Sequence, residues 1–362
     1  MANVLHIADI NVSPTSGMGR IAYHWQKGFE EAGHHWYHIG KEEVGSLSHP
    51  SQFTRKAKAY LKNELKLKPD VILAHEPVSG GVLDLGAPVA LFSHGIEQRE
   101  WNLRLNEYKP YYGATSLKSQ VLFPIWRLRN CNRGLRKSTL LMLSNSEDQA
   151  YAQTRYQREE EDIYIFKNGV VPAAEKPAKV LDNPSPVIGF NGTWLVRKGI
   201  HTMVDAAKML EKEGIKPRWL LFGVIAPEAE VLSAFPPSMH DQIEVVSRYA
   251  AEEEASLSQR CDIFILPSFY EGQSLALLQA MAMGHCCITT SCCAQVDLFR
   301  HKENGMLFEP GSAEGLAAAL REVILDSALR QRLGKQAQDE VEGRTWQHVR
   351  EEVVEKVMSH TL

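Results

Sequence analysis

The chain has 362 residues, enough for two domains of about 150 residues each. With 44% apolar and 23% charged residues, its composition is that of a globular protein and excludes a disordered chain. Forty Lys and Arg residues against 44 Asp and Glu residues leave a net charge of −4. We therefore expect no nucleic acid bound through bulk positive charge.

The N-terminal sequence does not predict a signal peptide, because no basic region precedes the first apolar run and Asp9 interrupts that run. The longest stretch without a formal charge, 272–296, contains Gln, Gly, His, Ser and Thr residues. It is predicted to form a buried helix followed by a buried strand, not a membrane span. Six cysteines in a chain of this length indicate reduced thiols and not a disulfide framework. We expect a cytoplasmic protein.

The first half of the chain alternates short apolar runs with helical or polar segments. The run 4–8 is followed by a loop rich in Gly, Ser and Pro and by an amphipathic pattern over 21–31. Further apolar runs lie at 71–74, 89–92, 139–143 and 163–166. Short strands separated by helices predict a parallel sheet with right-handed crossovers.

A proline-rich segment, 172–186, is predicted to be a linker between two domains, 1–171 and 187–340. After it, apolar runs restart at 187–190, 219–222, 243–246, 263–266 and 286–289, with helical patterns at about 199–213, 274–283 and 313–326. The sequence thus predicts an α/β protein with two doubly wound domains. A C-terminal helix over 341–362 is expected to pack back on the first domain. Ligands bind such sheets at the carboxyl ends of the strands, so the loops that follow strands are expected to carry the function.

Two loops that follow strands have residues suited to binding phosphate. Gly17 and Gly19 directly precede a helix, where backbone amides and the helix dipole attract an anion, although a plain tight turn explains these glycines equally well. After the strand at 187–190, the loop contains the adjacent cations Arg197 and Lys198. Arg can bridge two oxygens of a diphosphate while Lys supplies a point charge. A solvated basic pair is the alternative.

The strand at 263–266 leads into a loop with the carboxylate Glu271, followed by Gly272 and a helix that contains Gln279. A carboxylate at a loop-to-helix junction can accept hydrogen bonds from sugar hydroxyls while the free amides hold a phosphate. The alternative is a charge that only stabilises the helix N-terminus.

Taken together, these motifs resemble the retaining GT-B glycosyltransferases of family 4. The segment 271–275 with Gln279 is similar to the E-x7-E element of that family, and 197–199 is similar to its phosphate-binding segment. Secondary signatures are similar at 144–147, 167–170 and 304–310. The match covers about 1–20 and 140–345 and implies two Rossmann-like domains that face each other across a cleft.

The resemblance implies a nucleotide-sugar donor, linked to UDP or GDP, held mainly by the C-terminal domain. It implies a glycan or lipid-linked acceptor held mainly by the N-terminal domain. The implied catalytic residues are His94, Arg197, Lys198 and Glu271. The implied donor-binding residues are Gly17, Gly19, Gly192, Thr193, Arg248, Tyr249, Gly272, Gln273, Ser274, Leu275 and Gln279.

Two positions depart from the family pattern. Gln279 replaces the second Glu of the element, which usually accepts ribose hydroxyls, and an amide is a weaker acceptor than a carboxylate. Thr193 stands where Arg is frequent. Because the chain has no Asp-x-Asp motif, we expect no metal and no other cofactor, with Arg197 and Lys198 supplying the positive charge.

The expected activity is retaining hexosyl transfer by front-face attack, in cell-envelope or exopolysaccharide synthesis. The alternatives are a nucleotide-sugar epimerase on the same scaffold and a nucleotide-sugar-binding protein without turnover. Acceptor dependence separates the transferase from the epimerase, and turnover separates both from the binding protein.

Four further clusters remain. The stretches 55–68 and 118–137 are basic and amphipathic, which is typical of a helix that lies on an anionic membrane, so peripheral association with its inner face is predicted. A solvated or packed helix face is the alternative. His34, His35 and His38 are predicted to form a turn that leads into a strand, in preference to a metal site. The cysteine pairs at 286–287 and 292–293 are predicted to be small buried hydrophobes.

Overall fold

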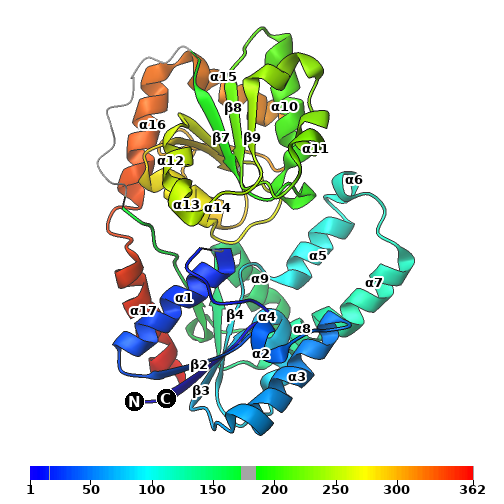
Figure 1. Ribbon diagram of the computed structural model, residues 1–362, viewed down its shortest axis with the longest axis vertical. Helices are drawn as coiled ribbons and strands as arrows, with labels where there is room; N and C mark the ends of the chain where they lie inside the picture. The colour runs from blue at the N-terminus through cyan, green and yellow to red at the C-terminus, as the bar shows by residue number, and fades with distance from the viewer. Residues whose placement is uncertain (16, 173–184, 362) are drawn as a thin grey trace. The chain divides into compact units, whose positions relative to one another are not determined.

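The computed structural model describes residues 1–15, 17–172 and 185–361. The chain forms two compact units: Met1–Gly169 with Trp346–Leu362, and Val170–Thr345. Each unit contains a six-stranded parallel sheet flanked by helices (Figure 1). The predicted class, two Rossmann-like α/β domains, is confirmed.

The first unit has the strand order β2-β1-β3-β4-β5-β6. Its strands are β1 (Asn3–Ile7), β2 (His35–Ile39), β3 (Val71–His75), β4 (Val89–Phe92), β5 (Leu140–Leu143) and β6 (Ile163–Ile165). Its helices are α1 (Gly17–Glu31), α2 (Lys41–Val44), α3 (Phe53–Tyr60), α4 (Glu76–Val82), α5 (Glu97–Leu105), α6 (Lys109–Tyr112), α7 (Leu117–Phe123), α8 (Arg129–Lys137), α9 (Ser146–Tyr156) and α17 (Trp346–Thr361). The histidine-rich segment forms β2, as its turn-and-strand interpretation predicted.

The second unit has the strand order β12-β11-β10-β7-β8-β9. Its strands are β7 (Val187–Asn191), β8 (Arg218–Phe222), β9 (Ile243–Val246), β10 (Ile263–Leu266), β11 (Cys286–Thr290) and β12 (Met306–Phe308). Its helices are α10 (Ile200–Lys212), α11 (Glu228–Ser233), α12 (Glu254–Gln259), α13 (Leu275–Ala282), α14 (Ala294–Leu298), α15 (Ala313–Leu325) and α16 (Ser327–Glu340). The uncharged stretch forms the buried helix α13 and the buried strand β11, as predicted.

Central strands of both sheets are apolar along their whole length because helices cover both faces. All residues of β4, β5 and β10 are buried. The cysteines, including the pairs in β11 and the loop after it, are buried as well, which confirms their interpretation as small core residues.

Helix α17 belongs to the first unit although it follows the second in sequence. It packs along α1, where the ring of Trp346 stacks on His24 with centroids 3.9 Å apart. Gly28 allows the close approach, since a Cβ there would lie 2.9 Å from the Cβ of Arg350. The sequence placed the boundaries at 171 and 340, whereas the units divide at 169/170 and 345/346. Most of the predicted linker 172–186 lies outside the described residues.

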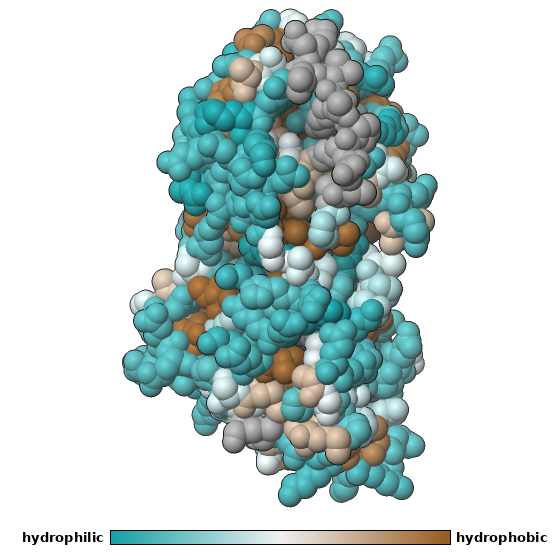
Figure 2. All heavy atoms as spheres, turned by 90° about the vertical axis from the view of Figure 1, so that its left-hand side faces the viewer, coloured by the Kyte–Doolittle hydropathy of each residue, from teal (hydrophilic) through white to brown (hydrophobic). Residues whose placement is uncertain are grey.

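On the face drawn in Figure 2, hydrophilic residues predominate and the apolar residues form small separate patches. Among the described residues, none of the helices combines the length and the apolar character needed to cross a membrane.

Candidate active site

The strand order of the second unit places a topological switch point between β7 and β10, where the loops that follow the two strands leave in opposite directions. In open parallel sheets, ligands bind in the crevice at this point, outside the carboxyl ends of the strands. The loop after β7 carries the short helical turn η5 (Val196–Lys198), and the loop after β10 carries Glu271. Both predicted donor motifs therefore meet at the switch point.

The two loops are joined by charged and backbone contacts. Lys198 Nζ lies 2.5 Å from Glu271 Oε2, and Arg197 Nη1 lies 3.7 Å from Glu271 Oε1. Arg197 also donates to the carbonyl of Tyr270 at 3.1 Å, while the amide of Phe269 donates to the carbonyl of Arg197 at 2.9 Å. The arrangement fixes two cations on one carboxylate and leaves one net positive charge.

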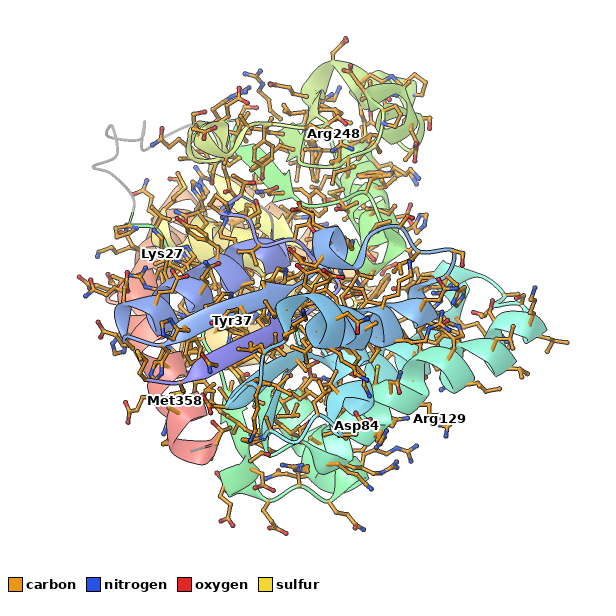
Figure 3. The ribbon with its side chains drawn as sticks, turned by 60° about the horizontal axis from the view of Figure 1, so that its bottom comes forward. Lys27, Tyr37, Asp84, Arg129, Arg248 and Met358 are labelled. Atoms are coloured by element: carbon orange, nitrogen blue, oxygen red, sulfur yellow. The ribbon has the colours of Figure 1, made fainter. Side chains whose placement is uncertain are left out.

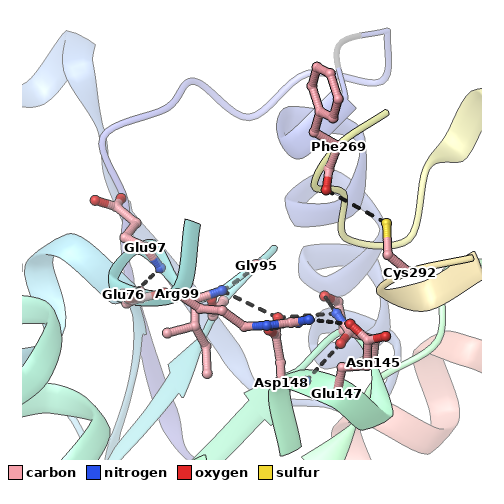
Figure 4. Close-up of polar contacts among 12 residues, drawn as sticks. Glu76, Gly95, Glu97, Arg99, Asn145, Glu147, Asp148, Phe269 and Cys292 are labelled. Carbon is pink, nitrogen blue, oxygen red and sulfur yellow. Dashed lines mark hydrogen bonds and ion pairs between the residues drawn. The ribbon is translucent and has the colours of Figure 1, made fainter. Parts of the chain in front are cut away.

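Glu271 is ionised in this setting. Burial by itself would raise the pKa of its carboxyl group, but the attraction of Lys198 and Arg197, together with a hydrogen bond from Ser268, lowers the pKa below its ordinary value. The backbone that holds Glu271 is anchored in turn, because Thr290 donates to the carbonyl of Ser268 and the thiol of Cys292 contacts the carbonyl of Phe269 (Figure 4). The carboxylate is therefore held by its surroundings before any ligand enters.

Gly199 makes the approach of the two loops possible. Its φ is +72°, in the left-handed region, and a Cβ there would lie 1.8 Å from the carbonyl oxygen of Pro267. Any other residue would push the cation-bearing turn away from the loop that carries Glu271.

The segment after Glu271 ends at the N-terminus of α13. Ser274 caps this helix by accepting a hydrogen bond from the amide of Leu277 at 3.4 Å. Arg344 donates to the side-chain oxygen of Gln273. Gly272, Gln273, Ser274 and Leu275 thus lie in one short stretch beside Glu271, where their backbone amides precede or begin a helix.

Gln279 contacts the main chain of Val171 at both ends of its amide group. Its oxygen accepts from the amide of Val171 at 3.3 Å, and its nitrogen donates to the carbonyl of the same residue at 3.0 Å. A glutamate could accept the first bond but could not donate the second. The departure from the family pattern therefore fits a contact that only an amide can complete.

The remaining predicted donor residues lie on neighbouring loops of the same unit. Tyr249, after β9, donates to Asn191 at the end of β7 at 3.0 Å, and Asn191 donates to Glu254 at 3.3 Å. Sequence reasoning missed Asn191 and Glu254. Asn191 could have been found, because it is a polar residue at the end of a buried strand. Gly192 and Thr193 follow it, and Arg248 is exposed.

In the first unit, His94 lies after β4 among aromatic rings, with centroids 5.7 Å from Phe92 and 5.6 Å from Phe166. Burial, together with the nearby His75, lowers its pKa to about 3. The ring is therefore neutral at physiological pH, where it can donate one hydrogen bond and accept another but is a weak base.

A network of charged residues near the switch point of the first unit escaped the sequence analysis. Asp9 follows β1 and accepts a hydrogen bond from Nδ1 of His75, at the end of β3, at 2.8 Å. Arg127 lies 3.7 Å from Asp9 and forms two hydrogen bonds with Glu97, at 2.5 and 2.6 Å. Burial favours the neutral form of Asp9, but His75 and Arg127 outweigh it and lower the pKa to about 2.

This network corrects one part of the membrane interpretation. Arg127 belongs to the basic stretch 118–137 that was predicted to lie on a membrane, but it is half-buried and paired with carboxylates. The segment 118–137 lacks acidic residues of its own, so the sequence could not show that Glu97 neutralises Arg127 from another helix.

Gly17 and Gly19 were expected in the loop before the helix, but α1 begins at Gly17, so both lie in its first turn. A Cβ on Gly17 would meet no atom within 4 Å, so the position is open. Gly19 is buried, and its carbonyl accepts a hydrogen bond from the amide of Ser13 at 3.2 Å.

Two of the secondary signatures hold the fold. Asn145 caps α9 by accepting from the amide of Asp148 at 2.8 Å, and Arg99 reaches the carboxylates of Asp148 and Glu147 (Figure 4). Asn304 accepts from the amide of Arg300 and donates to the carbonyl of Leu298. The side chains of Asn145 and Asn304 therefore fix the loops in which they lie.

The donor-side motifs fall inside the match to a known family: residues 173–340 match the model of "Glycosyl transferases group 1". The chain carries a group 1 glycosyl transferase domain. A curated relative, the "Capsular polysaccharide biosynthesis glycosyltransferase CapM" of Staphylococcus aureus, is 25% identical over 170 residues, which are 47% of this chain and 44% of CapM. The matched part of the chain thus spans about half the length of the first curated relatives.

Solved structures match the whole chain and show its GT-B fold. WaaG, a glycosyltransferase involved in lipopolysaccharide biosynthesis, superposes with a TM-score of 0.79 at 16% identity, covering 98% of this chain and 99% of WaaG. HepE of Anabaena, solved in complex with UDP, superposes with a TM-score of 0.67 at 14% identity, covering 99% of this chain and 100% of HepE. The similarity therefore extends beyond the group 1 domain to the first unit.

Proposed function

We propose that the protein is a retaining, metal-independent glycosyltransferase that moves a hexosyl group from a nucleotide sugar to a glycan or lipid-linked acceptor. The process we assign to it is the synthesis of cell-envelope or extracellular polysaccharide. The names of CapM and WaaG, which refer to capsular polysaccharide and lipopolysaccharide biosynthesis, support this assignment. UDP is the first candidate for the nucleotide, because HepE binds it on a similar fold, and GDP is the second.

The observation that carries the proposal is the cluster of Arg197, Lys198 and Glu271 at the switch point of the second unit. One carboxylate offsets only part of the charge of two cations, so the loop retains positive charge for a leaving diphosphate. These fixed cations can supply the charge stabilisation that a divalent metal gives in other transferases. Glu271 would accept hydrogen bonds from hydroxyl groups of the donor sugar.

Retention is assigned to front-face attack. The bond between C1 of the sugar and the diphosphate oxygen breaks, and the acceptor oxygen bonds to C1 on the same face. The acceptor proton passes to the departing phosphate oxygen, so no protein base is required. Glu271 is a poor candidate for a covalent nucleophile, because its charge is already engaged by Lys198 and Arg197.

A thermal-shift panel of UDP, GDP, ADP and their common sugars, with and without EDTA, tests the proposal. We expect one nucleotide family to raise the melting temperature by mass action, with no effect of EDTA. Lys198→Ala should abolish the shift. No shift with any nucleotide, or a shift that EDTA removes, would contradict the proposal.

Product analysis separates the alternatives. A transferase consumes the donor in an acceptor-dependent reaction, whereas an epimerase would change the sugar without an acceptor. A binding protein would give the thermal shift without turnover. NMR of the product linkage tests retention directly, because the anomeric configuration of the donor must be preserved.

We further propose that the first unit associates with the cytoplasmic face of an anionic membrane through α7 and the helical residues that follow it, 124–129. Apolar side chains on this segment are exposed: Leu117 by 80%, Val121 by 60% and Ile125 by 58%. Exposed cations flank them, including Lys118 and Arg129, whose side chain points away from the ribbon (Figure 3). Exposed apolar residues between cations are typical of a surface that enters anionic headgroups.

Flotation with vesicles tests the membrane proposal. We expect binding to vesicles with 30% phosphatidylglycerol, roughly the anionic content that attracts basic segments, and weak binding to phosphatidylcholine alone. Val121→Asp with Ile125→Asp should remove binding. Leu325→Asp, at an exposed apolar residue of α15, is the matched control and should not. Equal binding of both variants would contradict the proposal.

A further inference from the structure

The first unit contains a cavity of about 650 Å³ that none of the predicted site residues lines. It lies between the segments that follow β1 and β2 and the helices inserted between β4 and β5. Its size is that of a small-molecule site. Asp9 places it beside the switch point between β1 and β3, where parallel sheets bind ligands.

Aromatic side chains from four helical segments form much of its wall. Phe53 comes from α3, Trp101 from α5, Phe123 from α7, and Trp126 from the π-helical segment η3 (Pro124–Leu128). The rings of Trp101 and Phe123 stack with centroids 4.5 Å apart, and Trp126 meets Phe123 edge to face at 5.6 Å. Packed rings of this kind offer rigid apolar surfaces at little cost in conformational entropy.

The charged residues of the cavity balance. Its wall includes three carboxylates, Asp9, Glu97 and Glu100, and three cations, Lys41, Arg104 and Arg127. Arg127 is already bonded to Glu97 and lies near Asp9, and Arg104 lies over the rings of Trp101 and Tyr112. A phosphate entering this wall would find no excess positive charge, unlike at the Arg197–Lys198 turn of the second unit.

A neutral sugar fits such a wall better than an anion does. The C–H faces of a pyranose ring can pack on aromatic rings, while its hydroxyl groups donate to carboxylates and accept from a guanidinium. Arg104 lines the cavity, and its guanidinium can supply such a donor.

The cavity is also connected to His94, one of the catalytic residues that the family resemblance implies. Asp9, on the wall, accepts a hydrogen bond from His75, and the rings of His75 and His94 have centroids 6.0 Å apart. A ligand that contacts Asp9 is therefore linked to His94 through two side chains, Asp9 and His75.

We propose that this cavity binds the acceptor, and that the group it takes is an uncharged saccharide. The inference rests on the proposed transferase function, because it assigns the second substrate of that reaction. The part of the acceptor that enters the cavity is then a neutral sugar, and not a phosphorylated or acidic group.

The test is binding of the full chain, without donor, to an array of neutral and acidic mono- to tetrasaccharides, followed by titration of the best binder. Two variants alter the cavity in opposite ways: Trp126→Ala removes a ring, and Leu47→Trp fills space from another part of the wall. We expect each to weaken neutral saccharide binding at least tenfold. Gln120→Ala, an exposed residue of α7 that does not line the cavity, should bind as the wild type does.

The nucleotide thermal shift, measured on the same variants, separates the two hypotheses. If the shift stays intact while both cavity variants lose saccharide binding, the inference is supported. Binding of acidic saccharides only, binding of none, or neutral binding unaffected by both variants would overturn it while leaving donor binding in place. Absence of the nucleotide shift in the wild type would contradict the proposed function and not the saccharide site.

Discussion

The two units place polar residues at equivalent points of similar sheets but build different chemistry there. In the second unit, short loops after β7 and β10 bring two cations to one carboxylate and leave positive charge. In the first unit, the groups near the β1–β3 switch point are balanced, and long helical insertions between β4 and β5 add aromatic rings. The difference shows that one sheet topology can serve a charged ligand or a neutral one, depending on what its connections carry.

The largest effect is expected from removing the charge at the second switch point. Lys198→Ala should lower kcat/KM for transfer by about 10²–10³-fold, the loss typical of one electrostatic contact to a developing charge. Initial rates with saturating acceptor measure it. Lys208→Ala, an exposed lysine of α10 paired with Asp205, is the control and should keep the wild-type rate. Equal rates for both variants would mean that Lys198 does not face the diphosphate.

Backbone geometry of the second unit gives the next effect. Gly199→Ala combines a positive φ with a clash against Pro267, so we expect it to lower the free energy of unfolding by about 3 kcal/mol or more. Gly214→Ala has a similar φ of +79° but meets no atom within 4 Å, and should cost about 1 kcal/mol. Urea denaturation measures both. A similar loss in the two variants would show that the loops can separate without cost.

A smaller effect is expected at Gln279, where the two possible roles of the side chain predict opposite changes in nucleotide binding. Gln279→Glu removes the bond to the carbonyl of Val171 and sets two oxygens against each other, which should cost about 1 kcal/mol of stability without tightening nucleotide binding. If Gln279 acts instead on the ribose, the carboxylate should strengthen nucleotide binding. Isothermal titration with the nucleotide that shifts the wild type decides between them. The control is Gln336→Glu, an exposed residue that accepts from Arg332.

In the first unit, the buried Glu76 should make the stability depend on pH. Burial, the nearby Glu97 and, to a lesser extent, Asp148 raise its pKa well above the ordinary value. Above about pH 4.5 the unfolded chain therefore loses this proton more readily than the folded one, and stability falls as the pH rises toward the folded pKa.

Glu76→Gln keeps the shape but cannot titrate, so its advantage in melting temperature should grow by a few degrees between pH 5 and about pH 9. Thermal melts across this range measure the difference. Glu64→Gln, on the surface, should follow the wild type at each pH. Parallel curves for Glu76→Gln and the wild type would show that Glu76 ionises normally.

The second unit was the more predictable from sequence. Its strands are continuous apolar runs, and its site residues lie within a few positions of strand ends, so local patterns locate Arg197, Lys198 and Glu271. The short strand β12 was missed because three residues give too little periodicity. The bond between Gln279 and Val171 joins residues 108 positions apart, and no local pattern contains it.

The first unit resisted prediction for a physical reason. Its cavity is assembled from the segments that follow β1 and β2 and from α3, α5, α7 and η3, whose proximity depends on tertiary packing. Trp101 and Phe123 are ordinary apolar residues in sequence, and the residues around Arg127 do not show that Glu97, from another helix, is bonded to it. His94 could be located because it lies two residues after the end of β4, whereas the bond between Asp9 and His75 spans 66 positions.

The placement of α17 has a consequence for biosynthesis. During translation, the first 169 residues leave the ribosome long before the helix that covers α1, and all of the second unit is made in between. Until α17 is made, Gly28 and the ring of His24 lack their contacts with Arg350 and Trp346. A fragment that stops before residue 346 lacks this cover, so the first unit reaches its final form only after the second has been synthesised.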